Sequence, residues 1–439
     1  MTTRLVVLGG GAAGMSAASA ARRVDPGLEI VVLEATGYAA YGMCGLPYYL
    51  AGLVEAPEDL LAYPPAYFRE HRRLDLRHHA EAVELDIARR VVTYRHGGRP
   101  HRIGFSALVV TTGGAPIRPE LPGLAGRRVC TVRTMEDAIE LRRLLDTASI
   151  GRALVIGAGY IGLEMAEALH TRDCAVTVVD KLDRVLPNID STLATIVEEH
   201  VRERVELRLG VDAASMLTDP ALDVDVVVLS VGVHPASTIA ADAGAHTGPG
   251  RALLVDERMR TSLPGVWAAG DCIAPMHRVL GRPAFVPLGP AANKTGRVAG
   301  TIAAGGEAAF AGIVGTAVVK VFDLEVARTG LTLAEADAAG LTATATDVVS
   351  RSRAKYYPGA APLHVRLVHE AGGRLLGAQL VGREGAAKRV DVVAAALYAG
   401  LTVSDLAAFD LSYAPPYAPV YDPLIVAAQT AQQNLAVPV

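Results

Sequence analysis

The sequence has few cysteines, no cluster of positive charge and no long apolar run. Its four cysteines lie far apart without a CxxC pair, which argues against a disulfide scaffold and a zinc site. A net charge of −4 gives no basic surface for nucleic acid. No run of about 18 uncharged apolar residues predicts a membrane span, and the first residues lack the core of a signal peptide. We therefore expect a cytoplasmic protein without bound metal.

The chain is too long for one hydrophobic core, and its glycine-rich loops mark a repeat. Hydrophobic residues make up 51% of the 439 residues and charged residues 20%, so two or three domains are expected. Residues 4–34 have the pattern strand, glycine loop, helix and strand, and residues 152–180 repeat this order. Short β-branched runs that alternate with helical segments predict parallel, doubly wound sheets. The predicted fold class is α/β with two Rossmann-like dinucleotide-binding domains.

The first glycine loop has the GxGxxG spacing of a dinucleotide-binding turn. Its glycines are Gly9, Gly11 and Gly14, and Glu34 ends the strand that follows. Such glycines allow a tight turn, a close approach of the pyrophosphate and packing of the helix, whose N-terminus faces the phosphates. An acid about 20 residues further on accepts hydrogen bonds from ribose hydroxyls. We interpret these four residues as part of a cofactor site.

The second glycine loop repeats the pattern. Gly157 and Gly159 lie in the loop, and Asp180 ends the next strand. A carboxylate at this place favours a free ribose 2′-hydroxyl, and therefore NADH. Lys181 and Arg184 follow immediately and suit the 2′-phosphate of NADPH. The sequence therefore favours NADH and leaves NADPH open.

The predicted secondary-structure pattern changes near residue 316, where a third, α+β domain is expected. Residues 317–331 and 362–382 have the pattern of antiparallel strands, and EAGGR provides a hairpin turn in the second range. Helices are predicted near 386–399 and, earlier in the chain, around 57–73. Residues 411–424 contain too many prolines for regular structure.

Two further segments carry a family resemblance. Residues 261–272, TSLPGVWAAGDC, resemble the second FAD fingerprint of the flavoprotein disulfide reductases, and VTTGGAP is similar to the link between their two modules. With the two glycine loops, the resemblance covers the whole chain. It implies a glutathione-reductase-like fold in which the first loop holds FAD and the second holds NADH or NADPH. Asp271 would contact the ribityl chain, and Thr112 and Gly113 would belong to the cofactor site.

The same resemblance implies how the chain divides into domains. Residues 1–115 and 246–315 would form the FAD-binding domain, and residues 116–245 the NAD(P)H-binding domain. Residues 316–439 would form a dimerisation domain.

The cysteine motif resembles the single-cysteine branch of this family. Cys44, in YGMCGLPYYL, has no second cysteine at CxxxxC spacing. The branch contains NADH peroxidases and oxidases, coenzyme A-disulfide reductases and persulfide reductases. The peroxidases carry a histidine in the first glycine loop, where this chain has Ala12. Three stretches, CGLPYY, YYPG and SYAPPY, closely resemble coenzyme A-disulfide reductases.

The resemblance also implies roles for individual residues. Cys44 would be the redox residue over the flavin, able to hold coenzyme A as a mixed disulfide. Tyr413 and Tyr356, with the adjacent Tyr357 as an alternative, would reach the active site of the other subunit of a homodimer. The nicotinamide side is assigned to Tyr160, Ile161 and Glu164, and coenzyme A contacts to Arg22, Arg23 and Tyr417.

These assignments predict an NAD(P)H-dependent flavoprotein that reduces coenzyme A disulfide or a related low-molecular-weight disulfide or persulfide. The thiol of Cys44 is expected to have a pKa below the free value of about 8.5. The family often has Ser and Asn where this chain has Ala40 and Met43, which leaves the substrate open. An NADH oxidase or peroxidase that cycles through a sulfenate, and a flavin-based redox switch, are the alternatives. The three other cysteines are interpreted as structural, namely Cys130, Cys174 and Cys272.

Overall fold

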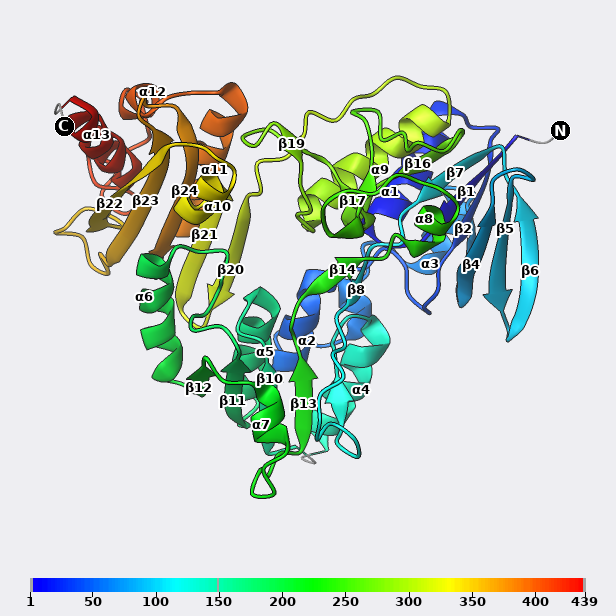
Figure 1. Cartoon of the computed structure of the whole chain (residues 1–439), viewed down its shortest axis with the longest axis horizontal. Helices are drawn as coiled ribbons and strands as arrows, with labels where there is room; N and C mark the ends of the chain where they lie inside the picture. Colours follow the sequence, from blue (N-terminus) through cyan, green and yellow to red (C-terminus); the bar gives the residue numbers. More distant parts are fainter. Residues whose placement is uncertain (1–2, 148–149, 437–439) are drawn as a thin grey trace.

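The computed structural model describes residues 3–147 and 150–436 and arranges them as three packed bodies around a central junction (Figure 1). In that view the first glycine module lies on the right, the second at the bottom and the C-terminal body at the upper left. Among the described residues, no helix is long and apolar enough to cross a bilayer. The same residues contain no group of three or more His, Cys, Asp or Glu side chains arranged to hold a metal ion.

The first module is built on a parallel five-stranded sheet with the order β16-β7-β1-β2-β3. Its main elements are β1 (Arg4–Leu8), α1 (Ala12–Val24), β2 (Glu29–Leu33), β3 (Asp75–Arg77), β7 (Ala107–Val110), β16 (Val266–Ala268) and α9 (Gly289–Ala303). Helices α1 and α9 pack at very short range, since a Cβ on Gly296 or Gly300 would lie 2.2 or 2.0 Å from a backbone oxygen of α1. Residues far apart in the sequence thereby form one core.

A three-stranded antiparallel sheet extends this module at the far right of Figure 1. It consists of β4 (Ala80–Asp86), β5 (Val91–His96) and β6 (Arg99–Gly104). The helix predicted around 57–73 was wrong as one continuous element. The segment forms a 3-10 turn, Pro57–Leu60, and a short helix, α3 (Pro65–Glu70). The proline pair at 64–65 explains the break, because proline is tolerated at the start of a helix and not in its interior.

The second module repeats the architecture with the order β12-β11-β10-β13-β9, and all its strand pairs are parallel. Its elements are β9 (Val129–Cys130), α4 (Met135–Asp146), β10 (Arg152–Ile156), α5 (Tyr160–Thr171), β11 (Ala175–Asp180), α6 (Ser191–Arg202), β12 (Glu206–Leu209), α7 (Ala213–Leu217) and β13 (Val226–Leu229). An antiparallel pair joins the modules, made of β8 (Gly114–Pro116) and β14 (Val233–Pro235). The predicted pair of doubly wound modules is confirmed.

The chain returns to the first module through short elements. These are α8 (Thr238–Asp242), β15 (Leu253–Leu254), β17 (Ile273–Ala274), β18 (Met276–His277) and β19 (Arg282–Pro283).

The third body is an antiparallel sheet, β20-β21-β24-β23-β22, covered by helices. Its elements are β20 (Ala317–Val321), β21 (Leu324–Gly330), α10 (Leu333–Ala338), β22 (Ala343–Arg351), β23 (Pro362–Glu370), β24 (Leu375–Gly382), α11 (Ala386–Ala399), α12 (Val403–Ala407) and α13 (Pro423–Ala436). The predicted hairpin at EAGGR joins β23 and β24, and the helix predicted near 386–399 is α11. Residues 411–422 form neither helix nor strand, as predicted. The domain boundaries at 115, 245 and 315 stay a prediction.

A short helix of the first module lies at the junction between the modules. Helix α2 (Leu46–Ala51) follows a 3-10 turn, η1 (Met43–Gly45), and packs against α4 and α5 (Figure 1). Its residues Leu46, Tyr49 and Leu50 are buried in the core of the second module. The apolar face of α2 therefore holds Cys44 where the two modules meet.

Candidate active site

The first glycine loop leaves open space beside one of its three glycines. Gly9 has φ +100°, and a Cβ there would lie 2.3 Å from the carbonyl oxygen of Thr111. A Cβ on Gly14 would lie 1.8 Å from the carbonyl oxygen of Gly9. Gly11, the N-cap of α1, has no atom within 4 Å of its Cβ position. Two glycines therefore serve the turn and the packing, while Gly11 leaves room for a phosphate at the helix N-terminus.

The second loop reproduces this geometry. Gly157 has φ +110°, with its Cβ position 2.4 Å from the carbonyl oxygen of Ser230, and the Cβ position of Gly162 lies 1.8 Å from the carbonyl oxygen of Gly157. Gly159, the N-cap of α5, again faces open space. Both loops fit a dinucleotide pyrophosphate for the same steric reason.

The two predicted ribose acceptors are held beside their glycine loops. The Glu34 carboxylate accepts hydrogen bonds from Gly10 N at 2.6 Å and from Thr36 N at 2.7 Å. Asp180 accepts from Ala158 N at 2.7 Å and from Leu182 N at 2.9 Å. Each carboxylate oxygen has more than one lone pair, so both groups keep acceptor capacity for ribose hydroxyls. Lys181, next to Asp180, is exposed.

The carboxyl ends of β7 and β16 bring the link segment and the second fingerprint together. Asp271 lies 3.6 Å from Arg133, and Arg133 Nε donates to the carbonyl oxygen of Gly114 at 3.0 Å. Thr112 Oγ1 donates to the carbonyl oxygen of Ala236, and Gly113 has φ +73°. Burial raises the pKa of Asp271, and Arg133 opposes this. These groups line the end of the sheet where ligands bind in doubly wound folds.

Arg133 is a site residue that sequence reasoning missed. It follows β9 in the second module and carries no motif of its own. Its guanidinium lies 3.6 Å from Asp271, and its charge lowers the pKa of both Asp271 and Cys44. The only signal in the sequence was a positive charge just before a capped helix, which is too common to be specific.

Cys44 is exposed, whereas Cys174 and Cys272 are buried and Cys130 is half-buried. Protein atoms nevertheless surround much of its sulfur. This partial burial raises the pKa of the Cys44 thiol, the carboxylates of Glu164 and Asp271 raise it further, and Arg133 opposes them. The prediction that the pKa of this thiol lies below its free value is therefore wrong when only the groups of the protein are considered.

The remaining cysteines have surroundings that disfavour a thiolate. Burial raises the pKa of Cys272 to about 11 and that of Cys130 to about 12. The sulfur of Cys272 lies 3.3 Å from the carbonyl oxygen of Ala269, and that of Cys174 lies 3.6 Å from that of Ile150. Their interpretation as structural residues agrees with this environment.

The two residues that depart from the family pattern have different surroundings. Met43 is half-buried and packs against the core of the second module. An apolar side chain therefore helps to seat the 3-10 turn that carries Cys44. Ala40 is buried with φ +52°, and its N–H donates to the carbonyl oxygen of Gly10 at 2.8 Å.

The nicotinamide-side residues lie on α5, next to α2. Tyr160 is half-buried and hydrogen-bonds the side chain of Asn188, while Ile161 is exposed. Glu164 hydrogen-bonds the Tyr48 hydroxyl of α2. Burial and the neighbouring Glu167 raise the pKa of Glu164 to about 7, and the Tyr48 bond opposes this.

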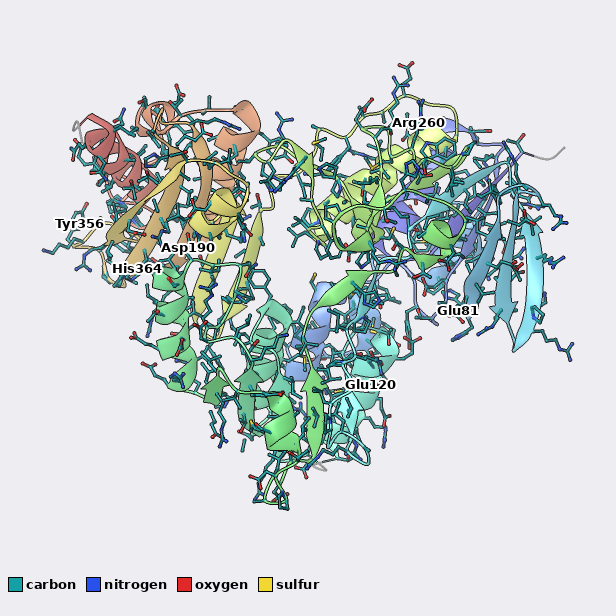
Figure 2. The ribbon with its side chains drawn as sticks, in the orientation of Figure 1. Glu81, Glu120, Asp190, Arg260, Tyr356 and His364 are labelled. Carbon is teal, nitrogen blue, oxygen red and sulfur yellow. The ribbon has the colours of Figure 1, made fainter. Side chains whose placement is uncertain are left out.

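The predicted tyrosines form an exposed group on the third body. The hydroxyl oxygens of Tyr356 and Tyr413 are 3.4 Å apart, and the exposed fractions of Tyr356 and Tyr417 are 75% and 79%. Tyr357 instead lies against Arg353, whose guanidinium carbon is 5.7 Å from the ring centroid. Tyr356 lies at the outer edge of this body, well away from α2 in the same chain (Figure 2).

The two arginines of α1 that are predicted to contact coenzyme A differ in how many hydrogen bonds hold them. Arg22 donates to the carbonyl oxygens of Arg72 at 2.9 Å, Arg73 at 2.8 Å and Pro26 at 2.9 Å. Its guanidinium therefore fixes a loop, whereas Arg23 is exposed. Arg23 is the better placed of the two for a phosphate.

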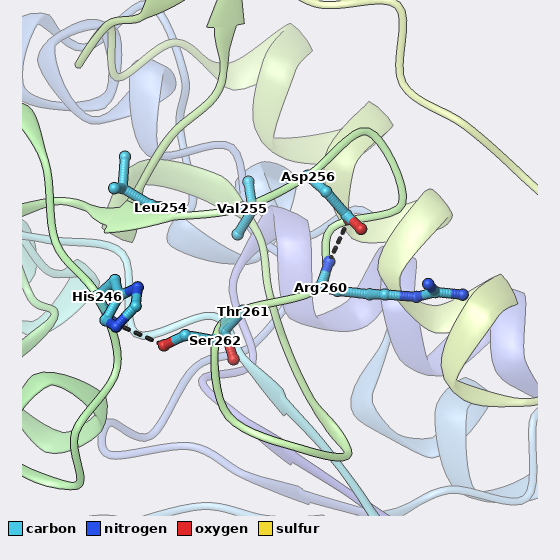
Figure 3. A pocket seen from close by; sticks show the side chains of 7 residues that line it. All are labelled: His246, Leu254, Val255, Asp256, Arg260, Thr261 and Ser262. Atoms are coloured by element: carbon cyan, nitrogen blue, oxygen red, sulfur yellow. Dashed lines mark hydrogen bonds between the residues drawn. The ribbon is translucent and has the colours of Figure 1, made fainter.

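Two open cavities are lined neither by Cys44 nor by residues of the two glycine loops. One of about 420 Å³ is lined by residues 246, 254–256 and 260–262, and Asp256 there accepts a hydrogen bond from Arg260 N at 2.8 Å (Figure 3). The other, of about 320 Å³, is bordered by Arg351, Arg353 and Lys355 beside the exposed tyrosines.

Comparison with known proteins agrees with this geometry. Residues 3–295 match the family model described as pyridine nucleotide-disulphide oxidoreductase, and residues 316–423 match the dimerisation domain of the same family. The NAD(P)H coenzyme A polysulfide/persulfide reductase of Pyrococcus horikoshii is 37% identical over 441 residues, covering 98% of each chain. A solved NAD-dependent persulfide reductase from A. fulgidus is 39% identical, with a TM-score of 0.94 over 98% of this chain and 83% of the other.

Other relatives carry different names. The NADH oxidase of Methanocaldococcus jannaschii is 31% identical over 446 residues, covering 99% of each chain. The coenzyme A disulfide reductase of Staphylococcus haemolyticus is 28% identical over 426 residues, covering 94% of this chain and 96% of the other. The chain therefore belongs to the pyridine nucleotide-disulphide oxidoreductases, which are flavoprotein enzymes that use FAD and NAD(P)H.

Proposed function

We propose that this protein uses NAD(P)H to reduce coenzyme A disulfide or a related low-molecular-weight disulfide or persulfide through Cys44. The observation that carries the proposal is the exposure of this one thiol at the junction of the two nucleotide modules. A lone cysteine suffices, because the substrate supplies the second sulfur in thiol–disulfide exchange. Relatives named for coenzyme A persulfide and disulfide reduction support the substrate class.

The proposed reaction at Cys44 has two stages, a thiol–disulfide exchange and a reduction. Bound FAD supplies a two-electron relay between the nicotinamide and the sulfur. The Cys44 thiolate attacks one sulfur of the disulfide RSSR, so the S–S bond breaks, a mixed disulfide forms and RS⁻ leaves. Two electrons from NAD(P)H then release the second thiol, so that NAD(P)H, one proton and RSSR give NAD(P)⁺ and two RSH.

The nucleotide loops determine where each dinucleotide is held. Gly11 and Glu34 would hold FAD, together with Asp271 at the end of β16. Gly159 and Asp180 would hold the nicotinamide dinucleotide. The fixed Asp180 carboxylate favours NADH, and the exposed Lys181 keeps NADPH as a second donor.

A homodimer would complete the site. Tyr356 and Tyr413 hydrogen-bond each other on an exposed surface far from α2 of their own chain. In the partner's site their hydroxyls would donate to the departing thiolate. The exposed Tyr417 and the basic border of the neighbouring cavity suit a polyanionic ligand such as coenzyme A.

Replacement of Cys44 tests the proposal directly. In Cys44→Ser, NAD(P)H-dependent reduction of coenzyme A disulfide and of glutathione persulfide should fall by on the order of 1,000-fold or more, as for loss of a nucleophile. The matched control is Cys130→Ser, which removes a half-buried thiol and should retain turnover. Undiminished turnover in Cys44→Ser would contradict the mechanism.

A second candidate is an NADH oxidase that cycles Cys44 through a sulfenate, which the relative of that name favours. Ala12 stands where peroxidases carry their histidine, so the described loop offers no imidazole to assist that chemistry. Oxygen uptake that equals NADH consumption would select this candidate.

A further inference from the structure

The helix that follows Cys44 belongs to the first module by sequence and to the second by packing. Helix α2 packs against α4 and α5, and its side chains Leu46, Tyr49 and Leu50 are buried in the core of the second module (Figure 1). A helix of six residues is too short to be stable without such contacts. The second module therefore determines where α2 lies, and α2 begins two residues after Cys44.

The turn that carries Cys44 is held by Leu60 on the side that precedes the cysteine. Gly42 N donates to the carbonyl oxygen of Leu60 at 2.8 Å, and Gly45 has no room for a Cβ beside the Leu60 side chain. On the side that follows the cysteine, the turn continues directly into α2. A movement of α2 would consequently displace the sulfur.

An arginine of the second module binds the C-terminal end of α2. Arg142 Nη1, from α4, donates to the carbonyl oxygen of Tyr49 at 2.6 Å. Its guanidinium carbon lies 5.1 Å from the centroid of the Tyr49 ring, within the range of a cation–π interaction. The last carbonyl groups of a helix lack partners further along it, and basic side chains stabilise them. Arg142 therefore contacts both the backbone and the ring of one residue of α2.

The guanidinium of Arg142 is itself held in place. Its Nε donates to the two carboxylate oxygens of Asp146 at 2.9 and 3.0 Å, and Arg172 Nη2 donates to Asp146 Oδ1 at 2.5 Å. Asp146 ends α4 and Arg172 follows α5, so this carboxylate joins the two helices against which α2 packs. A planar guanidinium with partners on both sides keeps one orientation, which fixes the carbonyl of Tyr49 as well.

The next residue of α4 provides a comparison. Arg143 pairs with Glu140 one turn earlier on the same helix, at 2.8 Å. Its side chain is 61% exposed, whereas that of Arg142 is 17% exposed. Pairs on an exposed helix surface contribute little to stability. Two adjacent arginines thus carry the same charge, and one of them binds α2 while the other lies on the surface.

We propose that Arg142 is a positioning residue for the reaction at Cys44. By fixing the Tyr49 end of α2 to the second module, it holds the sulfur in the place that thiol–disulfide exchange requires. The same module contains Gly159 and Asp180, which are proposed to hold the nicotinamide dinucleotide, so Arg142 keeps the thiol and the nicotinamide site on one rigid frame. The proposal rests on the proposed role of Cys44.

Arg142→Met tests this proposal, because it removes the donor and the charge and keeps an unbranched side chain. In the FAD-loaded enzyme, kcat for coenzyme A disulfide should fall by about 10- to 100-fold, as for a misplaced reacting group. The KM for NAD(P)H should stay as in wild type, since Gly159 and Asp180 are untouched. The rate at which iodoacetamide alkylates Cys44 in the NAD(P)H-reduced enzyme, followed by mass spectrometry of its peptide, should instead rise several-fold, because a loosened α2 gives the reagent freer access to the sulfur.

Three variants separate positioning from a loss of stability. Arg143→Met should leave both kcat and the alkylation rate unchanged. Asp190→Asn weakens the junction of the second module with the third body and should leave the alkylation rate unchanged. Asp146→Asn keeps an acceptor for Arg142 and removes the charge that two arginines share, so both rates should change as in Arg142→Met and by less. Asp146→Asn decides the question if Arg142→Met does not retain flavin.

Four results would overturn the proposal. These are an unchanged kcat in Arg142→Met, an unchanged or slower alkylation of Cys44 in that variant, the same rise in alkylation in Asp190→Asn, and the same effects in Arg143→Met. Alkylation needs no disulfide, so it reports on the placement of the thiol whatever the substrate is. Failure of the proposed function instead shows as full turnover in Cys44→Ser.

Discussion

The junction between the second module and the third body depends on Asp190 (Figure 2). Its Oδ2 accepts from Gln379 Nε2 at 2.6 Å and from Leu333 N at 3.2 Å, and it lies 3.7 Å from Arg366 Nε. The side chains of this ion pair are only 10% and 12% exposed. Asp190→Asn keeps the shape of the side chain and removes its charge from this buried pair.

The expected loss of unfolding free energy in Asp190→Asn depends on the partners that Arg366 keeps. Removal of one partner of a buried ion pair costs about 3–5 kcal/mol. Arg366 retains Asp347 at 3.2 Å, and that carboxylate is 46% exposed. We therefore expect a loss at the lower end of the range, about 3 kcal/mol, because the cation keeps a partly screened partner. If the 439-residue chain unfolds as one unit, the midpoint of thermal unfolding should fall by roughly 3 °C.

Calorimetry of the FAD-loaded protein would measure this shift at a fixed protein concentration. Asp347→Asn is the matched control, since it removes the other partner of the same arginine. That exposed pair should contribute less than about 1 kcal/mol. Equal losses in the two variants, or a midpoint of Asp190→Asn within about 1 °C of wild type, would refute the reasoning.

Two further predictions concern the first module and the acid on α5. Gly300→Ala should weaken flavin retention, because its Cβ would lie 2.0 Å from the carbonyl oxygen of Ala17, whereas Gly289→Ala, with open space at its Cβ, should retain the absorbance of bound flavin. The pKa of Glu164 is raised from 4.5 to about 7 in the folded protein, so folding keeps this carboxyl protonated where the unfolded chain would ionise it. The free energy of unfolding should therefore decrease as the pH rises from 4.5 to about 7. Relative to Glu164→Gln, the wild type should lose up to about 3 kcal/mol of unfolding free energy between these pH values, measured by urea unfolding, and parallel pH curves would contradict it.

Much of the fold could be predicted from local pattern. The glycine loops, the apolar strands around them and the hairpin at EAGGR each follow from short-range steric and burial rules, and the structure contains all of them. The helix around 57–73 failed because the proline pair at 64–65 outweighed an apparent periodicity. For the site, Cys44 was a candidate because its flanks resemble a known motif.

The residues that prediction missed lack any such local signal. Arg133 acts on Cys44 from another module, and Tyr48 meets Glu164 only because α2 packs against α5. Met43, unexplained as a departure from the family pattern, packs against the core of the second module. Each of these contacts joins segments from different elements or modules, so no spacing in the sequence reveals it.

The two nucleotide modules and the candidate redox thiol could be predicted from the sequence alone, because tight turns, helix N-termini and a missing second sulfur are properties of short segments. The environment of that thiol depends on contacts that form only when the modules pack together. Burial and the charges of Glu164 and Asp271 raise the pKa of the Cys44 thiol and Arg133 lowers it, and all of these act through space. The sequence therefore identifies the candidate thiol, and the packing of α2 between the modules determines which groups surround it.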